Sequence, residues 1–319
     1  MHKAVCGGIA FNIKGGKSPT HLHGKYSVGK VSGDKLILKP LEALYLFSRQ
    51  KIGPENRDLD GMYALLPVLL GEDEFLYRYR VFEHLKASGF QVNVEPDAMY
   101  FRRRGENTSR GPLMVRMESM ADSFVEIYRR APCIYAVVDE QDDMTIYEVT
   151  RTEPSGQRKD SWPESLECRK AGDRYVVPST SLPDWFGEEM GDARVLNATE
   201  MRALAALVPG SRGMGAGSMA KEELLDRVFA DMVSRGCIVK TGFKYGSNFR
   251  VYSRSIEDHA EMLLSVFDTD EWFKISRAVR VAHAVRKKMV FAGIVENALR
   301  YIQVERVKDF SGKVSQETS

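Results

Sequence analysis

The sequence predicts a mixed α/β (α+β) fold in which a unit of two subdomains occurs twice in tandem. Two observations carry this prediction. Three blocks of the first half recur in the second half in the same order, as expected of an internal duplication. Within each half, amphipathic helical stretches alternate with short stretches rich in β-branched and aromatic residues. We therefore expect each unit to have a small N-terminal α/β layer followed by a mixed sheet with helices.

The composition indicates a globular chain of two domains without a membrane segment. The chain has 319 residues, 43% of them hydrophobic, which is enough for two cores of ordinary size. No stretch of roughly eighteen uncharged apolar residues occurs, and residues 1–17 lack the apolar centre of a secretory signal, so we expect a cytoplasmic protein. No two cysteines form a C-x-x-C pair, which argues against a zinc site. We expect all four to be buried small hydrophobic residues: Cys6, Cys133, Cys168 and Cys237.

The first and third matched blocks lie at the two ends of each copy. In the first block, the residues after Gly29 match those after Gly187, and Glu42 falls on Glu200 without a gap. In the third, IYAVVDEQDDMTIYEVTR resembles VFAGIVENALRYIQVER, and both predict a strand, a short turn and a second strand. The two copies therefore begin and end in the same way.

The second block fixes the middle of each copy. YRYRVFEHLKASGFQV matches LLDRVFADMVSRGCIV, with Gly89 on Gly236, and both predict an amphipathic helix that ends at the glycine. Between the copies, turn-forming and charged residues without any period predict a linker. The expected parts are a first copy at 1–155, a linker at 156–172, an N-terminal subdomain of the second copy at 173–235 and its C-terminal subdomain at 236–319.

The local distribution of charge has to indicate a partner, because the net charge is only +2. Residues 274–288 carry six cations and no acid, whereas residues 139–143 read DEQDD. Both stretches are candidates for binding.

A tyrosine ends one predicted strand pair of the second copy. The segment CIVKTGFKYGSNFRVY (237–252) predicts two strands joined by a turn. Alternation places Phe249 and Val251 toward the core and leaves Arg250 and Tyr252 on the opposite, wetter face. Tyr252 is therefore available for chemistry, although a tyrosine that packs its ring and leaves its hydroxyl wet is the commoner explanation of such a pattern.

A histidine and a basic stretch follow. His259 lies at the edge of a polar loop, and because ordinary histidine titrates near about pH 6.5 it could transfer a proton at neutrality; a surface histidine is the commoner alternative. If RAVRVAHAVRKK is helical throughout, Arg280 and Lys287 share a face with His283, along which a phosphate could bind. A solvated cationic helix end is an equally good explanation.

A family resemblance gives these candidates a meaning. The strings GFKYGSNFRVY, the His259 that follows and RVAHAVRKK are similar to signature blocks of archaeal tRNA-splicing endonucleases, in the same order and at nearly the same separations. The resemblance covers the second half densely and the first half loosely. Length and duplication resemble the homodimeric form of that family, in which a degenerate unit precedes a catalytic one. It implies a nuclease-like mixed sheet in each C-terminal subdomain.

The resemblance also implies a mechanism without metal or cofactor. Tyr252 would be the base for the neighbouring 2′-hydroxyl, His259 the acid for the departing 5′-oxygen and Lys287 the cation for the phosphate. The products would be a 2′,3′-cyclic phosphate and a 5′-hydroxyl. Tyrosine is a weak acid, so a basic role at neutrality requires a nearby cation such as Lys287 to stabilise the phenolate.

The implied substrate is an intron-containing precursor tRNA, cut at its bulge-helix-bulge. Arg280 matches the family's arginine that packs against a bulge base, and Arg306, or with less support Arg300, could supply a second contact. A homodimer would address the two bulges with equivalent surfaces. By the same resemblance the acidic stretch would be an assembly loop that docks on the catalytic copy of the partner chain, through Asp139, Asp142 and Asp143; a solvated turn is the alternative.

Other interpretations stay open. The first copy lacks a histidine and the RVAHAVRKK block, so we expect it to be a scaffold, with possible RNA contacts from residues 102–104. The whole chain could be a non-catalytic RNA-binding or structural subunit, or a metal-dependent DNA nuclease on a similar core. His21 and His23 have no third metal ligand nearby, so a surface loop is expected there, and the glycine-rich residues 210–218 predict a flexible loop rather than a phosphate-binding one.

Overall fold

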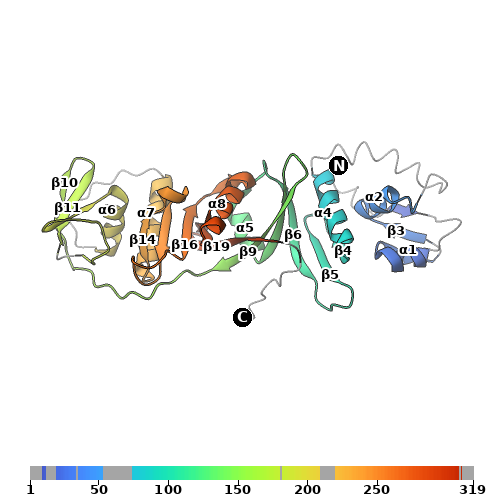
Figure 1. The fold of residues 1–319 in the computed structure, drawn as a ribbon, viewed down its shortest axis with the longest axis horizontal. Helices are drawn as coiled ribbons and strands as arrows, with labels where there is room; N and C mark the ends of the chain where they lie inside the picture. The colour runs from blue at the N-terminus through green and yellow to red at the C-terminus, as the bar shows by residue number, and fades with distance from the viewer. Residues whose placement is uncertain are drawn as a thin grey trace. The chain divides into compact units, whose positions relative to one another are not determined.

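The fold of the chain was analysed in a computed structural model, which describes residues 9–11, 19–33, 35–52, 74–179, 182–208, 220–308 and 310. Cys6 and the glycine-rich residues 210–218 lie outside these ranges. The chain divides into two compact units (Figure 1). Unit 1 comprises Met1–Met120, Pro132–Glu148 and Arg306–Ser319, and unit 2 comprises Ala121–Ala131 and Val149–Glu305. Both units mix helices with strands, which confirms the predicted fold class.

The small layer of unit 1 is a three-stranded antiparallel sheet with two helices. Its elements are β1 (Ile9–Phe11), α1 (Pro19–Tyr26), β2 (Lys30–Ser32), β3 (Lys35–Leu38) and α2 (Pro40–Ser48), with strand order β1-β3-β2. The carboxylate of Glu42 in α2 accepts hydrogen bonds from the backbone N–H groups of Lys39 (2.8 Å) and Gly29 (3.0 Å). Gly29 has a φ of 66° and no room for a side chain against β3, so glycine is required there.

The larger layer of unit 1 follows a helix that covers its sheet. Its elements are α4 (Phe75–Ala87), β4 (Phe90–Val94), β5 (Met99–Arg103), β6 (Arg110–Met117) and β8 (Cys133–Val138). Strands β4, β5 and β6 are antiparallel, and β6 pairs with β8 in parallel. The apolar face of α4 packs on β4, with Phe82 and Phe101 among the buried core residues. After β8, β9 (Met144–Thr152) runs from unit 1 into unit 2.

The small layer of unit 2 is a four-stranded antiparallel sheet with one helix, whose second half repeats that of the first layer. Its elements are β10 (Arg169–Ala171), β11 (Arg174–Pro178), β12 (Glu188–Met190), β13 (Ala193–Leu196) and α6 (Ala198–Leu207), with strand order β10-β11-β13-β12. Glu200 accepts from the backbone N–H of Asn197 (3.0 Å), as Glu42 does from Lys39, and Gly187 has a φ of 76° against β13. These details agree with the first matched block of the sequence.

The larger layer of unit 2 is a mixed sheet. Its elements are α7 (Ala220–Ser234), β14 (Ile238–Thr241), η2 (Phe243–Tyr245), β15 (Phe249–Tyr252), β16 (Met262–Val266), β17 (Thr269–Glu271), α8 (Trp272–Ala284), β18 (Lys288–Val295) and β19 (Ala298–Val307), with β7 (Ala121–Ser123) and α5 (Phe124–Arg130) from earlier in the chain. The strand order is β14-β15-β16-β18-β19, in which β16 and β18 are parallel. Helices α5 and α8 both pack on β18, and the Trp272 indole donates to buried Asp122 (2.8 Å). The mixed sheet therefore holds α8 firmly.

From β2 in the first copy and β12 in the second, helices and strands follow in the same order apart from the short η2, which agrees with the predicted duplication; before that point the first copy has β1 and α1 and the second has β10 and β11. In each copy a small layer leads to a helix that ends at a glycine with positive φ, 85° at Gly89 and 78° at Gly236, and an antiparallel strand pair follows. No helix or strand lies between β9 and β10, but β10 begins inside the predicted linker. The subdomain boundaries at 155, 172 and 235 stay predictions.

Three smaller expectations can be compared with the structure. Cys133 and Cys237 are buried, and burial raises the pKa of the Cys237 thiol to about 11, as fits an inert core residue; Cys168 is half buried. His21 and His23 lie in α1 rather than in a loop, because the helix begins two residues earlier, at Pro19. Within the described ranges, no helix is long and apolar enough to cross a membrane, and no three potential ligands gather around a metal position.

Candidate active site

The candidate catalytic residues lie at one edge of three neighbouring strands of unit 2, where β15 ends and β16 and β18 begin. Val251 of β15 pairs with Met262 of β16, which pairs with Lys288 of β18. The next residues beyond this row, strand by strand, are Tyr252, Glu261 and Lys287. Because neighbouring strands lie about 4.8 Å apart, the backbones of the outer two residues are roughly 10 Å apart. Side chains from both can therefore reach one reacting phosphate.

Tyr252 is the last residue of β15 and is more enclosed than expected. The predicted alternation is confirmed for Phe249 and Val251, which are buried, and for Arg250, which is half exposed. Tyr252 was expected on a wet face, but only 6% of its surface is exposed. The expectation was wrong because Tyr252 belongs to the hydrophobic core cluster of unit 2 although it ends the strand. The ring is thus fixed by the core.

His259 lies in an exposed loop, residues 253–260, that leaves the sheet after Tyr252 and returns at Glu261. Glu261 closes the neck of this loop. Its backbone N–H donates to the Val251 carbonyl (3.2 Å), and its carboxylate accepts from the backbone N–H of Ser253 (2.8 Å) and contacts the Ser253 hydroxyl. The loop that carries His259 is therefore anchored at both ends beside Tyr252.

Lys287 is positioned by the turn that ends α8. The helix stops at Ala284, and Arg286 adopts a left-handed φ of 56°. The Lys287 backbone N–H then donates to the Ala282 carbonyl (2.9 Å), which is the long hydrogen bond of a Schellman turn. Arg280 and Lys287 would share a face only if the helix continued to Lys287, and it does not, because the reversal at Arg286 takes Lys287 off the helix before β18 begins.

The ammonium group of Lys287 connects the turn to the histidine loop. It donates a hydrogen bond of 2.6 Å to the carbonyl oxygen of Ala260, the neighbour of His259. The backbone of Lys288 donates to the Glu261 carbonyl (3.0 Å), so the two segments are joined twice. A lysine ammonium has three donors, so two remain for an anionic oxygen.

The surroundings of Lys287 are cationic, as the sequence predicts. Arg280 lies on the exposed face of α8, opposite the buried face that includes Ile275 and Val279. Arg286 and Lys288 are exposed on either side of Lys287. His283, in the last turn of α8, is also exposed. This arrangement can attract a phosphate backbone.

Residues 156–158, which follow β9, form hydrogen bonds next to Tyr252. The backbone N–H of Gln157 donates to the Ser253 carbonyl (2.7 Å), next to Tyr252. Gly156 lies so close to Gly236 that a side chain would overlap the Gly236 carbonyl. The backbone N–H of Arg158 donates to that same carbonyl (3.1 Å). We call residues 156–158 the strap.

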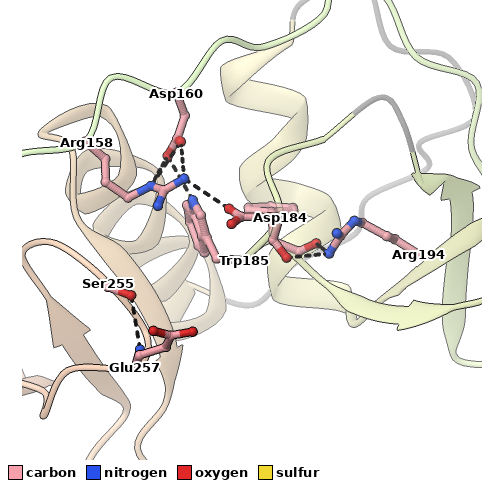
Figure 2. Close-up of polar contacts among 8 residues, drawn as sticks. Arg158, Asp160, Asp184, Trp185, Arg194, Ser255 and Glu257 are labelled. Carbon is pink, nitrogen blue, oxygen red and sulfur yellow. Dashed lines mark hydrogen bonds and ion pairs between the residues drawn. The ribbon is translucent and has the colours of Figure 1, made fainter.

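The side chain of Arg158, the last residue of the strap, is joined to the small layer of unit 2. Figure 2 shows the Arg158 guanidinium between the carboxylates of Asp160 (2.7 Å) and Asp184 (3.0 Å), with the Trp185 indole donating to Asp160 (2.8 Å). Burial raises the pKa of Asp160, but the hydrogen bonds from Arg158 and Trp185 outweigh burial and hold it below its ordinary value. The carboxylate therefore stays charged, and the strap is held at both ends.

Not all predicted site residues lie in unit 2. Tyr252, His259, Lys287 and Arg280 do, as does the half-exposed Arg300 of β19. Unit 1 contains the exposed Arg306 and the acidic turn: Asp139, Asp142 and Asp143.

The acidic turn joins β8 to β9 and is partly satisfied within its own unit. A carboxylate oxygen of Asp139 accepts from the backbone N–H groups of Gln141 and Asp143, both at 2.9 Å. Asp142 forms an ion pair with Arg80 (3.1 Å). The carboxylate of Asp143 is exposed.

Sequence reasoning missed the residues that hold the site together. The residues Glu261, Ser253 and Gln157 were not among the sequence-based candidates. No local pattern marks them, because their role depends on strand pairing and on a chain segment far away in sequence. A serine and a glutamate at the two ends of a short loop between strands is the one signal that could have found the neck.

Comparisons with known proteins decide the family. A family model described as "tRNA intron endonuclease, catalytic C-terminal domain" matches residues 224–301, a range that contains Tyr252, His259 and Lys287. A relative from Thermoplasma volcanium named tRNA-splicing endonuclease is 36% identical over 310 residues, 97% of this chain and 99% of the relative. The chain belongs to the tRNA-splicing endonuclease family.

Further members of the tRNA-splicing endonuclease family match over most of their length. The one from Picrophilus torridus is 32% identical over 302 residues, 95% of this chain and 96% of its own. The one from Methanosarcina acetivorans is 30% identical over 335 aligned positions, 88% of this chain and 92% of its own. The similarity therefore includes unit 1, although the family model covers only part of unit 2.

Proposed function

We propose that this chain is a tRNA-splicing endonuclease that cuts intron-containing precursor tRNA at its bulge-helix-bulge, leaving 2′,3′-cyclic phosphate and 5′-hydroxyl ends. The observation that carries the proposal is the convergence of Tyr252, the His259 loop and Lys287 at adjacent strand ends. The comparisons support the substrate class, because relatives of nearly equal length carry that name. In a cell the enzyme would act in the cytoplasm.

The three side chains would divide the reaction between them. Tyr252, as phenolate, takes the proton of the 2′-hydroxyl, and the 2′-oxygen forms a bond to the adjacent phosphorus. The bond from phosphorus to the 5′-oxygen breaks, and His259 gives that oxygen a proton. Lys287 stabilises the charge that builds up on the non-bridging oxygens. No metal or cofactor takes part in this scheme.

The positions of the three residues suit these roles. Tyr252 is held in the core at a strand end, so its ring cannot drift from the reacting hydroxyl. His259 is exposed on a loop whose two ends are anchored, which lets it approach a leaving group on the solvent side. Lys287 lies two strands away from Tyr252, and its ammonium is directed at the histidine loop by its hydrogen bond to the Ala260 carbonyl.

Recognition of the bulges would rest on arginines. The exposed face of α8 presents Arg280, whose planar guanidinium can stack on an unpaired base. Arg306 is proposed as a second contact. Both are long, exposed side chains that can follow an irregular RNA backbone.

The active form is proposed to be a homodimer in which the acidic turn of one chain docks on the catalytic copy of its partner. Asp139 stiffens the turn from inside, which leaves Asp143 to meet a basic surface. Asp142 would exchange or keep its ion pair with Arg80. Reversing the charge of Asp142 and Asp143 is expected to weaken dimerisation and activity together.

The test is cleavage of a defined RNA. Purified protein in excess chelator is incubated with an end-labelled RNA that contains a bulge-helix-bulge, alongside a fully paired RNA and the Lys287→Ala protein. Paired cuts in the two bulges with cyclic phosphate ends, absent in both controls, are the expected result. Binding of the RNA without cleavage by the folded wild-type protein would instead support a non-catalytic RNA-binding or structural subunit.

A further inference from the structure

Unit 1 contains a cleft of about 490 Å³ between its small layer and the strand pair β4–β5. Pockets of roughly 300–1,000 Å³ are typical of small-ligand sites in proteins. The cleft is lined from the small layer by the end of α1 and the loop before β2, and from the sheet by one face of β4 and β5. Two of its lining residues, Arg102 and Arg104, belong to the stretch for which the sequence suggested RNA contacts.

The sheet side of the cleft is a row of aromatic, cationic and amide side chains. Along β5, Met99 and Phe101 are buried, whereas Tyr100 and Arg102 point to the other face, and the row continues to the exposed Arg104. On β4, the cross-strand partner of Tyr100 is Asn93 and that of Arg102 is Gln91, so amides face the cleft as well. Arg102 donates through Nε to the Gln91 amide oxygen (3.2 Å), so the two side chains of this cross-strand pair are joined.

The pairing register of β4 with β5 can be compared with that of β14 with β15 in unit 2. With Gly89 equivalent to Gly236, Gln91 is equivalent to Ile238. The partner of Gln91 is Arg102, and the partner of Ile238 is Tyr252. Arg102 therefore occupies in unit 1 the position that Tyr252 occupies in unit 2. At this register position unit 1 carries a permanent cation where unit 2 carries the proposed base.

The charge of the cleft is positive at its mouth. Its one acidic lining residue, Glu42, is 7% exposed, and both of its carboxylate oxygens already accept backbone N–H groups. Arg104 makes no hydrogen bond or ion pair with any residue that the structure describes, and among the described lining residues Glu42 is the only carboxylate. Exposed His23 donates through Nδ1 to the Val28 carbonyl (3.0 Å), when that nitrogen carries the proton, and so presents its other nitrogen outward.

We propose that this cleft binds a single-stranded segment of the RNA substrate, outside the cut itself. Arg102 and Arg104 bind phosphate oxygens, and an unpaired base lies against Tyr100 within reach of the amides of Gln91 and Asn93. This combination of a cationic groove, an aromatic ring and amide groups is the chemistry by which proteins hold single-stranded RNA. An acidic peptide would use the arginines but not the ring and amides. The proposal rests on the proposed function, because it assumes an RNA substrate.

The test measures binding separately from cleavage. The Lys287→Ala protein, in which the proposed chemistry is disabled, is titrated with a bulge-helix-bulge RNA that carries single-stranded extensions, with and without the further changes Arg102→Gln and Arg104→Gln. The expected result is a roughly tenfold loss of affinity at moderate salt, with a salt slope smaller by about 1.4, since each single-strand phosphate contact contributes about 0.7. The matched control is Arg169→Gln with Lys170→Gln, which removes two exposed cations of unit 2.

A crosslink locates the contact. RNA with 4-thiouridine in the extensions is expected to crosslink to the peptide that contains Tyr100, and trimming the extensions should remove both the crosslink and the effect of the arginine changes. Unchanged affinity in the Arg102 and Arg104 variant, or an equal loss in the control variant, would overturn the proposal. So would a changed oligomeric state with unchanged RNA binding, which would point to a protein ligand.

The two proposals fail in different ways. If the wild-type protein does not cut the bulge-helix-bulge RNA, the proposed function is wrong, whatever the binding data show. If it cuts the RNA and the arginine variant binds as tightly as its parent, only the cleft proposal is wrong.

Discussion

The ammonium of Lys287 donates a hydrogen bond to the carbonyl oxygen of Ala260, 2.6 Å away. Ala260 is buried and directly follows His259, so this bond fixes the end of the loop that carries the proposed acid. Lys287 therefore has two connected tasks: it provides the positive charge at the site and holds the acid in place. A substitution there should affect both.

Replacing Lys287 by methionine is expected to lower the single-turnover cleavage rate by about 10²–10³-fold, because both the charge and the bond to Ala260 are lost. Lys287→Arg keeps the charge but cannot place a compact ammonium against the carbonyl, so an intermediate rate is expected. Lys288→Ala is the control, since that side chain is exposed and only its backbone joins the loop. If Lys287→Met and Lys288→Ala were equally defective, the total positive charge of this region, and not the position of Lys287, would matter.

Glu261 closes the neck of the histidine loop through Ser253. Glu261→Ala is expected to lower the cleavage rate by roughly tenfold while RNA affinity stays the same, because the loop loses its anchor but no phosphate contact is removed. Glu257→Ala, in the same loop, removes an exposed carboxylate that forms no such neck and should have little effect. Rates and dissociation constants measured on the same RNA check this; a loss of affinity without a loss of rate would contradict it.

The strap depends on a glycine. A methyl group at position 156 would overlap the Gly236 carbonyl, so Gly156→Ala must push the strap away from Ser253. We expect a loss of about 1–3 kcal/mol in the free energy of unfolding, as is usual for overpacking, together with a slower cleavage step. Ser155→Ala changes an exposed neighbour and should alter neither quantity. Urea unfolding and single-turnover kinetics measure both; a Gly156→Ala protein of normal stability would show that the approach is not tight in solution.

The stability of the protein should depend on pH through Lys86. Its ammonium donates to the carbonyls of Tyr26 and Ser27, and burial lowers its pKa from 10.5 to about 8, although Glu42 opposes the shift. Between these two pKa values the unfolded chain binds more protons than the folded one. The contribution of Lys86 to stability therefore rises as pH rises from about 8 to 10.5, and below about 8 the cost of burying the charge is present in full.

Replacing Lys86 tests the direction of this change in stability with pH. Relative to Lys86→Met, the wild-type protein should gain stability on the order of 2 kcal/mol between pH 7.5 and 10.5, allowing for the partial exposure of the side chain. Lys25→Met, which removes an exposed lysine of α1, should show no such difference. Urea-unfolding midpoints at the two pH values measure it, and a constant difference between wild type and Lys86→Met would refute the buried-charge explanation.

The sequence allowed the fold class and the order of elements to be predicted because both depend on local patterns. The glycines that end α4 and α7 have the positive φ that such positions favour, and the alternation in β15 placed Phe249 and Val251 correctly. The end of α8 was harder, because RVAHAVRKK contains no glycine or proline. The left-handed turn there is made by Arg286, a residue type that rarely marks one.

The site could be predicted only in part. Residue types and a family resemblance pointed to Tyr252, His259 and Lys287, but no pattern predicted that Tyr252 is enclosed or that Glu261 and Gln157 support it. Those contacts join segments up to about a hundred residues apart, as between Gln157 and Ser253, and depend on strand register. Register is fixed by the packing of the whole sheet, which short-range sequence patterns do not specify.

The most direct test of the proposed chemistry is single-turnover cleavage of an RNA whose scissile 5′-oxygen is replaced by sulfur. A thiolate leaves without a proton, so an enzyme that lacks only its acid should cut this RNA at a nearly normal rate. We predict that His259→Ala is strongly defective on the oxygen substrate and close to wild type on the sulfur substrate, whereas Tyr252→Phe and Lys287→Ala stay defective on both. If sulfur fails to restore His259→Ala, or restores all three variants equally, His259 is not the acid and the assignment of roles at this site is wrong.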